Sequence, residues 1–291
     1  MPDRLLRSVL YVPADRPRAI AKAREVACDA VVVDLEDSIA PEGKEAARGA
    51  MRSSVAEGRF DKPFAVRING LDTPWATEDI LAAVAVGADA VLMTKVRVPE
   101  NIHQVADILE RADSKAEIWA MIETPRAILC VEEIAAVADK SASPLTCLVL
   151  GTNDLALEMR TTLTPNRAAF VPWFMKVIAA ARTYGLDVLD GVLNDYRDDA
   201  RFEAECRHGR MLGMDGKTLI HPAQIETANS IFGPSEEEIA DARLVVGTFA
   251  RPENVGKGVI GIEGRMVERL HLLAAERVLV RAEAIARRKS T

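Results

Sequence analysis

The chain has 291 residues, of which 49% are hydrophobic, so it can bury a large core within one large α/β domain. Its 37 Lys and Arg residues against 44 Asp and Glu residues give a net charge of −7, which argues against nucleic acid as a partner. No apolar run reaches the ~18 residues of a membrane span, and the four cysteines form no closely spaced pair. We therefore expect a soluble cytoplasmic protein with reduced cysteines and no membrane partner.

Short β-branched runs alternate along the chain with longer Ala-rich segments of helical period, which predicts repeated strand–helix units and a parallel sheet. The expected strands cover residues 8–13, 30–36, 64–69, 90–95, 117–123, 146–151, 188–192 and 217–221. The expected helices cover residues 19–27, 44–57, 77–86, 101–112, 128–138, 167–184, 199–212 and 223–232. Several of these strands are apolar on both faces, which favours a buried parallel sheet over a sandwich. Eight such units predict a TIM (β/α)8 barrel over residues 1–232.

Residues 233–291 form a C-terminal helical extension beyond the predicted barrel. Ser235 opens a capping box for a helix ending near residue 250, and a last helix is expected over 266–288. The glycine-rich stretch between them could be a flexible linker, a lid hinge or an ordered loop that contacts a partner subunit. We favour the partner contact, because an extension beyond a complete barrel would have no core of its own to join.

Two carboxylates follow consecutive predicted strands, Glu123 after the fifth and Asp154 after the sixth. Parallel barrels place their chemistry at these strand ends, so the two side chains should stand side by side at the barrel mouth. Two carboxylates, completed by water and an oxygen-rich substrate, are a typical Mg²⁺ site, whereas zinc would call for His or Cys. The alternative is a salt bridge of these acids to Arg67 or Lys95.

Asp34, Glu36 and Asp37 crowd the end of the second strand, and Arg67 ends the third. Three acids this close need a neighbouring cation, so they either hydrogen-bond to the ligands of a metal site or bind a cation themselves. We take Asp37 as a catalytic candidate. Asp37 with Ser38 could equally be an ordinary turn. The Arg67 guanidinium could bind a substrate carboxylate or enolate through two parallel bonds, or simply pair with the neighbouring acids.

Tyr11 lies in the first strand, and a cationic segment with Arg16, Arg18 and Lys22 follows it. This segment could bind the phosphates of an extended ligand such as a nucleotide-bearing thioester, or it could be a solvated helix start. Of the four histidines only His221 ends a predicted strand, where a structural hydrogen-bonded role is favoured over a general base. The sequence contains neither a glycine-rich dinucleotide fingerprint nor a P-loop.

Six segments in order resemble the citrate lyase β-subunit-like family of CoA-ester lyases within the HpcH/HpaI aldolase superfamily. The similarity covers essentially the whole chain. The segments are Tyr11 to Lys22, Asp34-Leu35-Glu36-Asp37-Ser38, Arg67-Ile68-Asn69-Gly70, Met121-Ile122-Glu123-Thr124-Pro125, Gly151-Thr152-Asn153-Asp154-Leu155 and Ile220-His221-Pro222-Ala223-Gln224-Ile225.

The resemblance implies roles for individual residues of this chain. It implies that Glu123 and Asp154 are ligands of Mg²⁺, with Mn²⁺ as an alternative, and that Arg67 binds substrate. The residues that it implies for substrate or CoA contact are Tyr11, Arg16, Lys22, Asn153, Ile220 and His221. The family commonly carries an aspartate in its final segment that enters the neighbouring subunit's site, whereas this chain has Glu268, whose carboxylate is one methylene further out.

The resemblance implies a Mg²⁺-dependent lyase that reversibly cleaves a carbon–carbon bond in a 3-hydroxy-dicarboxylyl-CoA. Such a substrate would be (3S)-malyl-CoA or a methyl homologue, with acetyl-CoA and a 2-oxoacid such as glyoxylate as products. One alternative is a (3S)-malyl-CoA thioesterase that releases malate and CoA. Another is a catalytically silent citrate lyase β subunit of a larger assembly. The resemblance further implies a homo-oligomer, a trimer or a hexamer.

Overall fold

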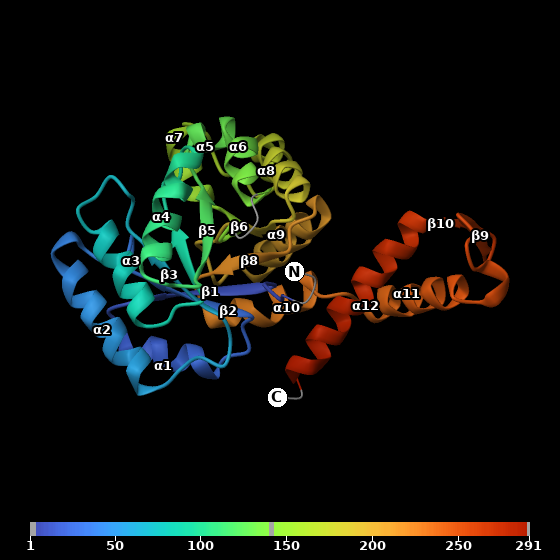
Figure 1. Ribbon diagram of the computed structural model, residues 1–291, viewed down its shortest axis with the longest axis horizontal. Coiled ribbons are helices and arrows are strands. Elements are labelled where there is room, and N and C mark those ends of the chain that lie inside the picture. The colour runs from blue at the N-terminus through green and yellow to red at the C-terminus, as the bar shows by residue number, and fades with distance from the viewer. Residues whose placement is uncertain (1–3, 140–142, 290–291) are drawn as a thin grey trace. The chain divides into compact units, whose positions relative to one another are not determined.

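The computed structural model describes residues 4–139 and 143–289. Eight parallel strands close into a barrel in chain order, with β1 pairing both β2 and β8 (Figure 1). The strands are β1 Ser8–Pro13, β2 Ala30–Asp34, β3 Phe64–Ile68, β4 Ala90–Met93, β5 Glu117–Ile122, β6 Leu145–Leu150, β7 Asp187–Asp190 and β8 Gly216–Leu219. The predicted (β/α)8 barrel is therefore confirmed.

Helices separate the strands and form the outer layer of the barrel (Figure 1). They are α1 Pro17–Glu25, α2 Lys44–Glu57, α3 Ala76–Ala85, α4 Pro99–Arg111, α5 Pro125–Leu129, α6 Val131–Ala136, α7 Thr152–Glu158, α8 Val171–Thr183, α9 Asp199–Leu212 and α10 Ile225–Phe232. The expected helix over 128–138 is two short helices, because the chain bends at Cys130 between them. Helix α7 was not predicted, since its seven residues are too few for a clear apolar period.

The barrel strands are buried on both faces, as their sequences predict; all five residues of β2, for example, are buried. Inward-facing side chains such as Val9, Val32 and Trp119 fill the barrel interior as one hydrophobic cluster. Tyr11, in the second half of β1, packs against this cluster. All four cysteines are buried and none forms a disulfide. A filled interior leaves the open end of the barrel, where the strands finish, as the place for a ligand.

The chain divides into two compact units, of which one is the barrel, Leu6–Ala228, and the other consists mainly of the residues from Asn229 onward. The second unit contains α11 Glu236–Phe249, the hairpin β9 Val259–Ile262 with β10 Arg265–Glu268, and α12 Arg269–Lys289. The Ser235 hydroxyl accepts a hydrogen bond from the backbone N–H of Glu238, which forms the predicted capping box.

The expectation that this extension has no core of its own is wrong. Val245, Phe249, Ile260, Ile262 and Val267 belong to a hydrophobic cluster of buried side chains within it. The glycine-rich stretch contains the β9–β10 hairpin, whose two turn residues both have positive φ, 49° and 80°. This combination suits a two-residue hairpin turn that favours glycine. The four glycines concealed the alternation of exposed and buried residues in β9.

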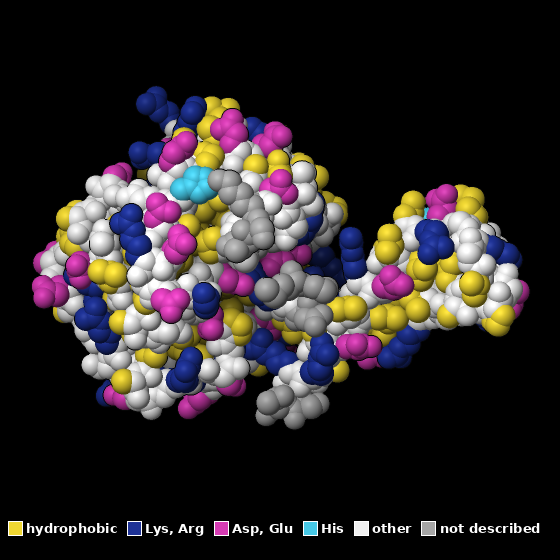
Figure 2. All heavy atoms as spheres, viewed as in Figure 1, with side chains coloured by type: hydrophobic (Ala, Val, Ile, Leu, Met, Phe, Trp, Pro, Cys, Tyr) yellow, Lys and Arg dark blue, Asp and Glu magenta, His cyan; other side chains and the backbone are white. Residues whose placement is uncertain are grey.

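Lys and Arg side chains are interspersed with Asp and Glu on the face that Figure 2 shows. Within residues 4–139 and 143–289, no helix is both long enough and apolar enough to cross a membrane.

Candidate active site

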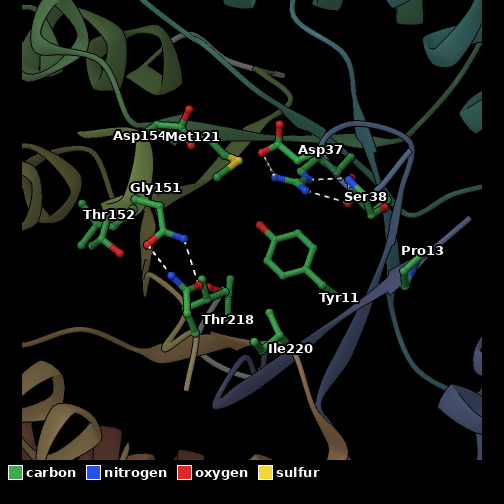
Figure 3. A pocket seen from close by; sticks show the side chains of 16 residues that line it. Tyr11, Pro13, Asp37, Ser38, Met121, Gly151, Thr152, Asp154, Thr218 and Ile220 are labelled. Atoms are coloured by element: carbon green, nitrogen blue, oxygen red, sulfur yellow. Dashed lines mark hydrogen bonds and ion pairs between the residues drawn. The ribbon is translucent and has the colours of Figure 1, made fainter. Parts of the chain in front are cut away.

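A cavity of about 370 Å³ opens at the carboxyl ends of the barrel strands. Several of the side chains that line it are drawn in Figure 3. They come from β1, β2, β3, β5, β6 and β8, from the start of α7 and from the loops that follow the strands, and they include Tyr11, Asp34, Arg67, Met121, Asp154 and Thr218. The strand ends singled out in the sequence therefore meet around one cavity.

The acids after β2 hold Arg67 in place. Its guanidinium donates two parallel hydrogen bonds of 2.6 Å to the Asp34 carboxylate, and its third nitrogen lies 3.0 Å from Glu36 and 3.6 Å from Asp37. Burial alone would raise the pKa of Asp34, but the charge and hydrogen bonds of Arg67 outweigh it and lower that pKa. The predicted pairing of Arg67 with these acids is confirmed, and each guanidinium nitrogen already lies next to a carboxylate oxygen.

The Asp34 carboxylate also accepts hydrogen bonds from the backbone N–H groups of Glu36 and Ser38. The turn after β2 is thus fixed by the same side chain that orients Arg67. Asp37 projects from this turn toward the cavity, and its side chain is 63% exposed. Both interpretations of this segment, an ordinary turn and an acid cluster at the cavity, therefore apply together.

Lys95 brings the two predicted metal ligands together. Its ammonium forms an ion pair with the Asp154 carboxylate and lies 4.0 Å from Glu123 and 3.6 Å from Glu36. The backbone N–H of Lys95 donates a hydrogen bond of 2.6 Å to the Glu123 carboxylate. The Lys95 backbone has a left-handed conformation (φ 52°) that only a few per cent of non-glycine residues adopt. The predicted salt-bridge alternative is present, and it shows that both carboxylates converge on one position of positive charge.

Glu123 is 1% exposed, and burial raises its pKa to about 7 although Lys95 acts in the opposite direction. The carboxylate has room only because residue 151 is glycine: a Cβ at Gly151 would lie 2.4 Å from Glu123 Oε2. In the described part of the chain no cluster of three or more His, Cys, Asp or Glu could hold a metal. Two neighbouring carboxylates, one of them buried, fit Mg²⁺, which keeps several waters and needs few protein ligands.

The Tyr11 ring lies below Arg67, with the guanidinium carbon 4.9 Å from the ring centroid. Its phenol points into the cavity (Figure 3). The hydroxyl oxygen is buried and has no hydrogen-bond partner among the residues that the structure describes. Burial raises the pKa of Tyr11, so the hydroxyl stays protonated. Leaving such a group unpaired costs about 1–3 kcal/mol in the ligand-free protein.

Asn153 and Asn194 close another side of the cavity. Their side-chain amides exchange two hydrogen bonds of 3.1 Å each, which links the segment after β6 to the loop after β7. Asn153 was a predicted substrate contact, whereas Asn194 was not singled out. The sequence gives no local signal for this pair, because the two residues are 41 positions apart.

A buried ionic network supports the ends of β7 and β8. Arg167 donates to both carboxylate oxygens of Asp190 at 2.7 Å, and the Lys217 ammonium lies 3.2 Å from both Asp190 and Glu205. Lys217 also donates to the backbone carbonyl of Gly191, at the start of the loop that carries Asn194. Sequence reasoning did not identify this network, whose four side chains are at most 2% exposed.

The residues assigned to CoA by resemblance occupy different places. Ile220 lines the cavity. His221 accepts a hydrogen bond from the backbone N–H of Ala223, which caps the turn Pro222–Gln224, and its ring stacks on Tyr196. Arg16 and Lys22 are exposed, pair with Asp15 and Glu25, and do not line the cavity.

Glu268 ends β10 in the second unit, where its backbone N–H donates to His271. Its proposed catalytic role depends on a neighbouring copy of the chain, and it stays a prediction.

Comparison with known proteins places this geometry in a family. Residues 7–222 match the family described as HpcH/HpaI aldolase/citrate lyase. A (3S)-malyl-CoA thioesterase of Cereibacter sphaeroides is 41% identical, over 96% of this chain and 95% of the relative. An L-malyl-CoA/beta-methylmalyl-CoA lyase of Rhodobacter capsulatus is 30% identical, over 97% and 96%.

Among solved structures, the chain is similar to CitE from Mycobacterium tuberculosis in complex with magnesium, acetoacetate and coenzyme A. The TM-score is 0.78 at 29% identity, with 97% of this chain and 100% of the other covered. The closed barrel agrees with these similarities, and the chain belongs to the HpcH/HpaI aldolase/citrate lyase family.

Proposed function

We propose that this chain is a Mg²⁺-dependent enzyme that hydrolyses the thioester of (3S)-malyl-CoA or a close homologue to the free acid and CoA. The observation that carries this proposal is the 41% identity to a (3S)-malyl-CoA thioesterase over nearly the full length of both chains. The lyase relative is more distant, at 30% identity. We therefore favour thioester hydrolysis over carbon–carbon cleavage, although the sequence resemblance alone favoured carbon–carbon cleavage.

Glu123 and Asp154 would hold the metal, with Mn²⁺ as an alternative to Mg²⁺. The support is that both carboxylates already face one cation, the Lys95 ammonium. When bound, the ion supplies Lewis-acid polarisation of the substrate oxygens that it contacts. Because the similar CitE structure from Mycobacterium tuberculosis is a complex with magnesium and coenzyme A, Mg²⁺ and CoA esters are the ligands to test first.

Arg67 would bind the acid end of the substrate or the developing negative charge, because its guanidinium is held rigidly by Asp34 at the cavity wall. Asp37 lies on the same wall, partly exposed to water. In hydrolysis Asp37 would accept a proton from the attacking water, whose oxygen would bond to the thioester carbon. The carbon–sulfur bond would then break, and the CoA thiolate would take up a proton. Asn153 would contact substrate, and the residues that would contact CoA are Tyr11, Arg16, Lys22, Ile220 and His221.

The second candidate function is reversible cleavage of a carbon–carbon bond in the same substrate, (3S)-malyl-CoA, to acetyl-CoA and glyoxylate. It is supported by the carboxylate pair, which can serve an aldol-type reaction equally well, and by the lyase relative. In that reaction Glu268 of a neighbouring copy would protonate the enolate carbon. The extension formed by residues 233–291 would then act as a lid or an inter-subunit segment in a homo-oligomer such as a trimer or hexamer.

One assay separates these reactions. The purified chain is incubated with (3S)-malyl-CoA and related 3-hydroxyacyl-CoA esters, with and without Mg²⁺, and all products are identified by mass spectrometry. Malate with free CoA indicates hydrolysis, whereas glyoxylate with acetyl-CoA indicates cleavage. Glu123→Ala should abolish the Mg²⁺-dependent turnover in both cases. A chain that binds no Mg²⁺ and converts no CoA ester would refute both and favour a silent subunit of a larger assembly.

A further inference from the structure

The Tyr11 hydroxyl is a hydrogen-bond donor that meets no acceptor among residues 4–139 and 143–289. It belongs to the fourth of the six residues of β1, and its oxygen atom is buried. The phenol points into the same cavity that Arg67 and Asp154 line (Figure 3). A buried donor aimed into a cavity of this size is suited to a ligand that brings its own acceptor atom.

The neighbouring cation, Arg67, already faces acidic side chains of the protein. Each nitrogen of the Arg67 guanidinium lies next to an oxygen of Asp34, Glu36 or Asp37. Arg67 also covers the Tyr11 ring, which keeps the phenol in one orientation. The hydroxyl is therefore a preorganised neutral donor beside a cation that already faces three carboxylates.

We propose that Tyr11 is a catalytic residue whose hydroxyl donates a hydrogen bond to the thioester carbonyl oxygen of the bound substrate, and holds that oxygen as it gains negative charge. This inference rests on the proposed function. In hydrolysis, water adds to the carbonyl carbon and gives up a proton, and the carbonyl electron pair moves to the oxygen that Tyr11 contacts. The pair returns when the carbon–sulfur bond breaks, so Tyr11 keeps its proton throughout. In carbon–carbon cleavage the same oxygen carries the enolate charge, so the role is common to both reactions.

The test is Tyr11→Phe, which removes one oxygen atom and leaves the ring beneath Arg67. We expect kcat/KM for (3S)-malyl-CoA to fall by about 10²–10³-fold, the usual loss for one oxyanion donor, mostly through kcat. Tyr184→Phe is the matched control, because Tyr184 lies beyond the end of α8 and does not line the cavity. This control should keep the wild-type kcat/KM.

A binding measurement tests the acceptor atom directly. We expect Tyr11→Phe to bind acetyl-CoA roughly 2- to 10-fold more weakly than the wild type, as for one hydrogen bond. Its affinity for S-ethyl-CoA, a thioether without the carbonyl oxygen, should be unchanged. Equal weakening for both ligands would overturn the inference, since the hydroxyl would then not contact the carbonyl.

Thermal unfolding without ligand provides a further check. Because the hydroxyl has no partner in the part of the chain that the structure describes, Tyr11→Phe should unfold at the wild-type temperature or above it. A lower melting temperature would reveal a structural role and overturn the inference. If the wild type converts (3S)-malyl-CoA and Tyr11→Phe keeps more than half of its kcat, the inference fails while the proposed function stands. If the wild type neither binds nor converts a CoA ester, the proposed function itself fails.

Discussion

The affinity for Mg²⁺ should decrease steeply below neutral pH, because the buried Glu123 carboxyl must lose its proton before it can bind a cation. Burial raises the pKa of this carboxyl to about 7, against 4.5 for an ordinary glutamate. If one proton competes with the metal, the dissociation constant rises roughly 2-fold at pH 7 and roughly 10-fold at pH 6, relative to pH 8 or above. A glutamate with an ordinary pKa would leave the affinity almost constant over this range.

Isothermal titration calorimetry with Mg²⁺ at pH 8, 7 and 6 measures this dependence. Repeating the titration in buffers of different ionisation enthalpy counts the protons released, which should approach one per metal at pH 6. Burial also raises the pKa of the nearby Glu36 to about 7, so Glu36→Gln is the control. That variant should keep the pH dependence, whereas Glu123→Gln should lose it along with most of the affinity. A wild-type affinity that does not change between pH 8 and 6 would refute the reasoning.

Two further predictions concern packing around the site. Lys217→Met leaves the buried Asp190 and Glu205 carboxylates without their ammonium and should lower the free energy of unfolding, measured in urea, by about 3–5 kcal/mol. The control Arg207→Ala, which breaks an exposed ion pair on α9, should lower it by at most about 1 kcal/mol. Equal losses in the two variants would contradict a structural role of the network. Gly151→Ala forces a Cβ against Glu123 and should weaken Mg²⁺ binding, measured by calorimetry. The control Gly49→Ala, whose new Cβ meets no atom within 4 Å, should leave Mg²⁺ binding unchanged. Wild-type Mg²⁺ affinity in Gly151→Ala would show that the glycine is dispensable.

The fold and the ends of its strands could be predicted because burial on both faces leaves a strong local signal. The first strand was predicted with the bounds that the structure shows, and the sixth within one residue. Glu123, Asp154 and Arg67 were identified because they fall at the ends of predicted strands, where parallel barrels place their chemistry, and the structure brings all three to the same end of the barrel. Their proposed roles in metal and substrate binding remain predictions.

Other features depend on contacts between distant parts of the chain, and the sequence carries little trace of them. Lys95 was considered only as a salt-bridge partner, because its left-handed backbone and its reach to two acids follow from the tertiary structure. The Asn153–Asn194 pair and the Lys217 network are of the same kind. Tyr11 is an intermediate case: the alternation of β1 places it on the face of Val9, which could have indicated that its ring points inward.

The position of the Lys95 ammonium between two carboxylates has a consequence for how the protein would take up a divalent ion. The Lys95 ammonium lies beside both carboxylates that we propose as metal ligands, so binding of a divalent ion there would require this ammonium to move away from them. Depletion by a chelator should then leave the barrel folded, because the ammonium returns and neutralises the acids. The resting enzyme would thus be protected against scarcity of the metal.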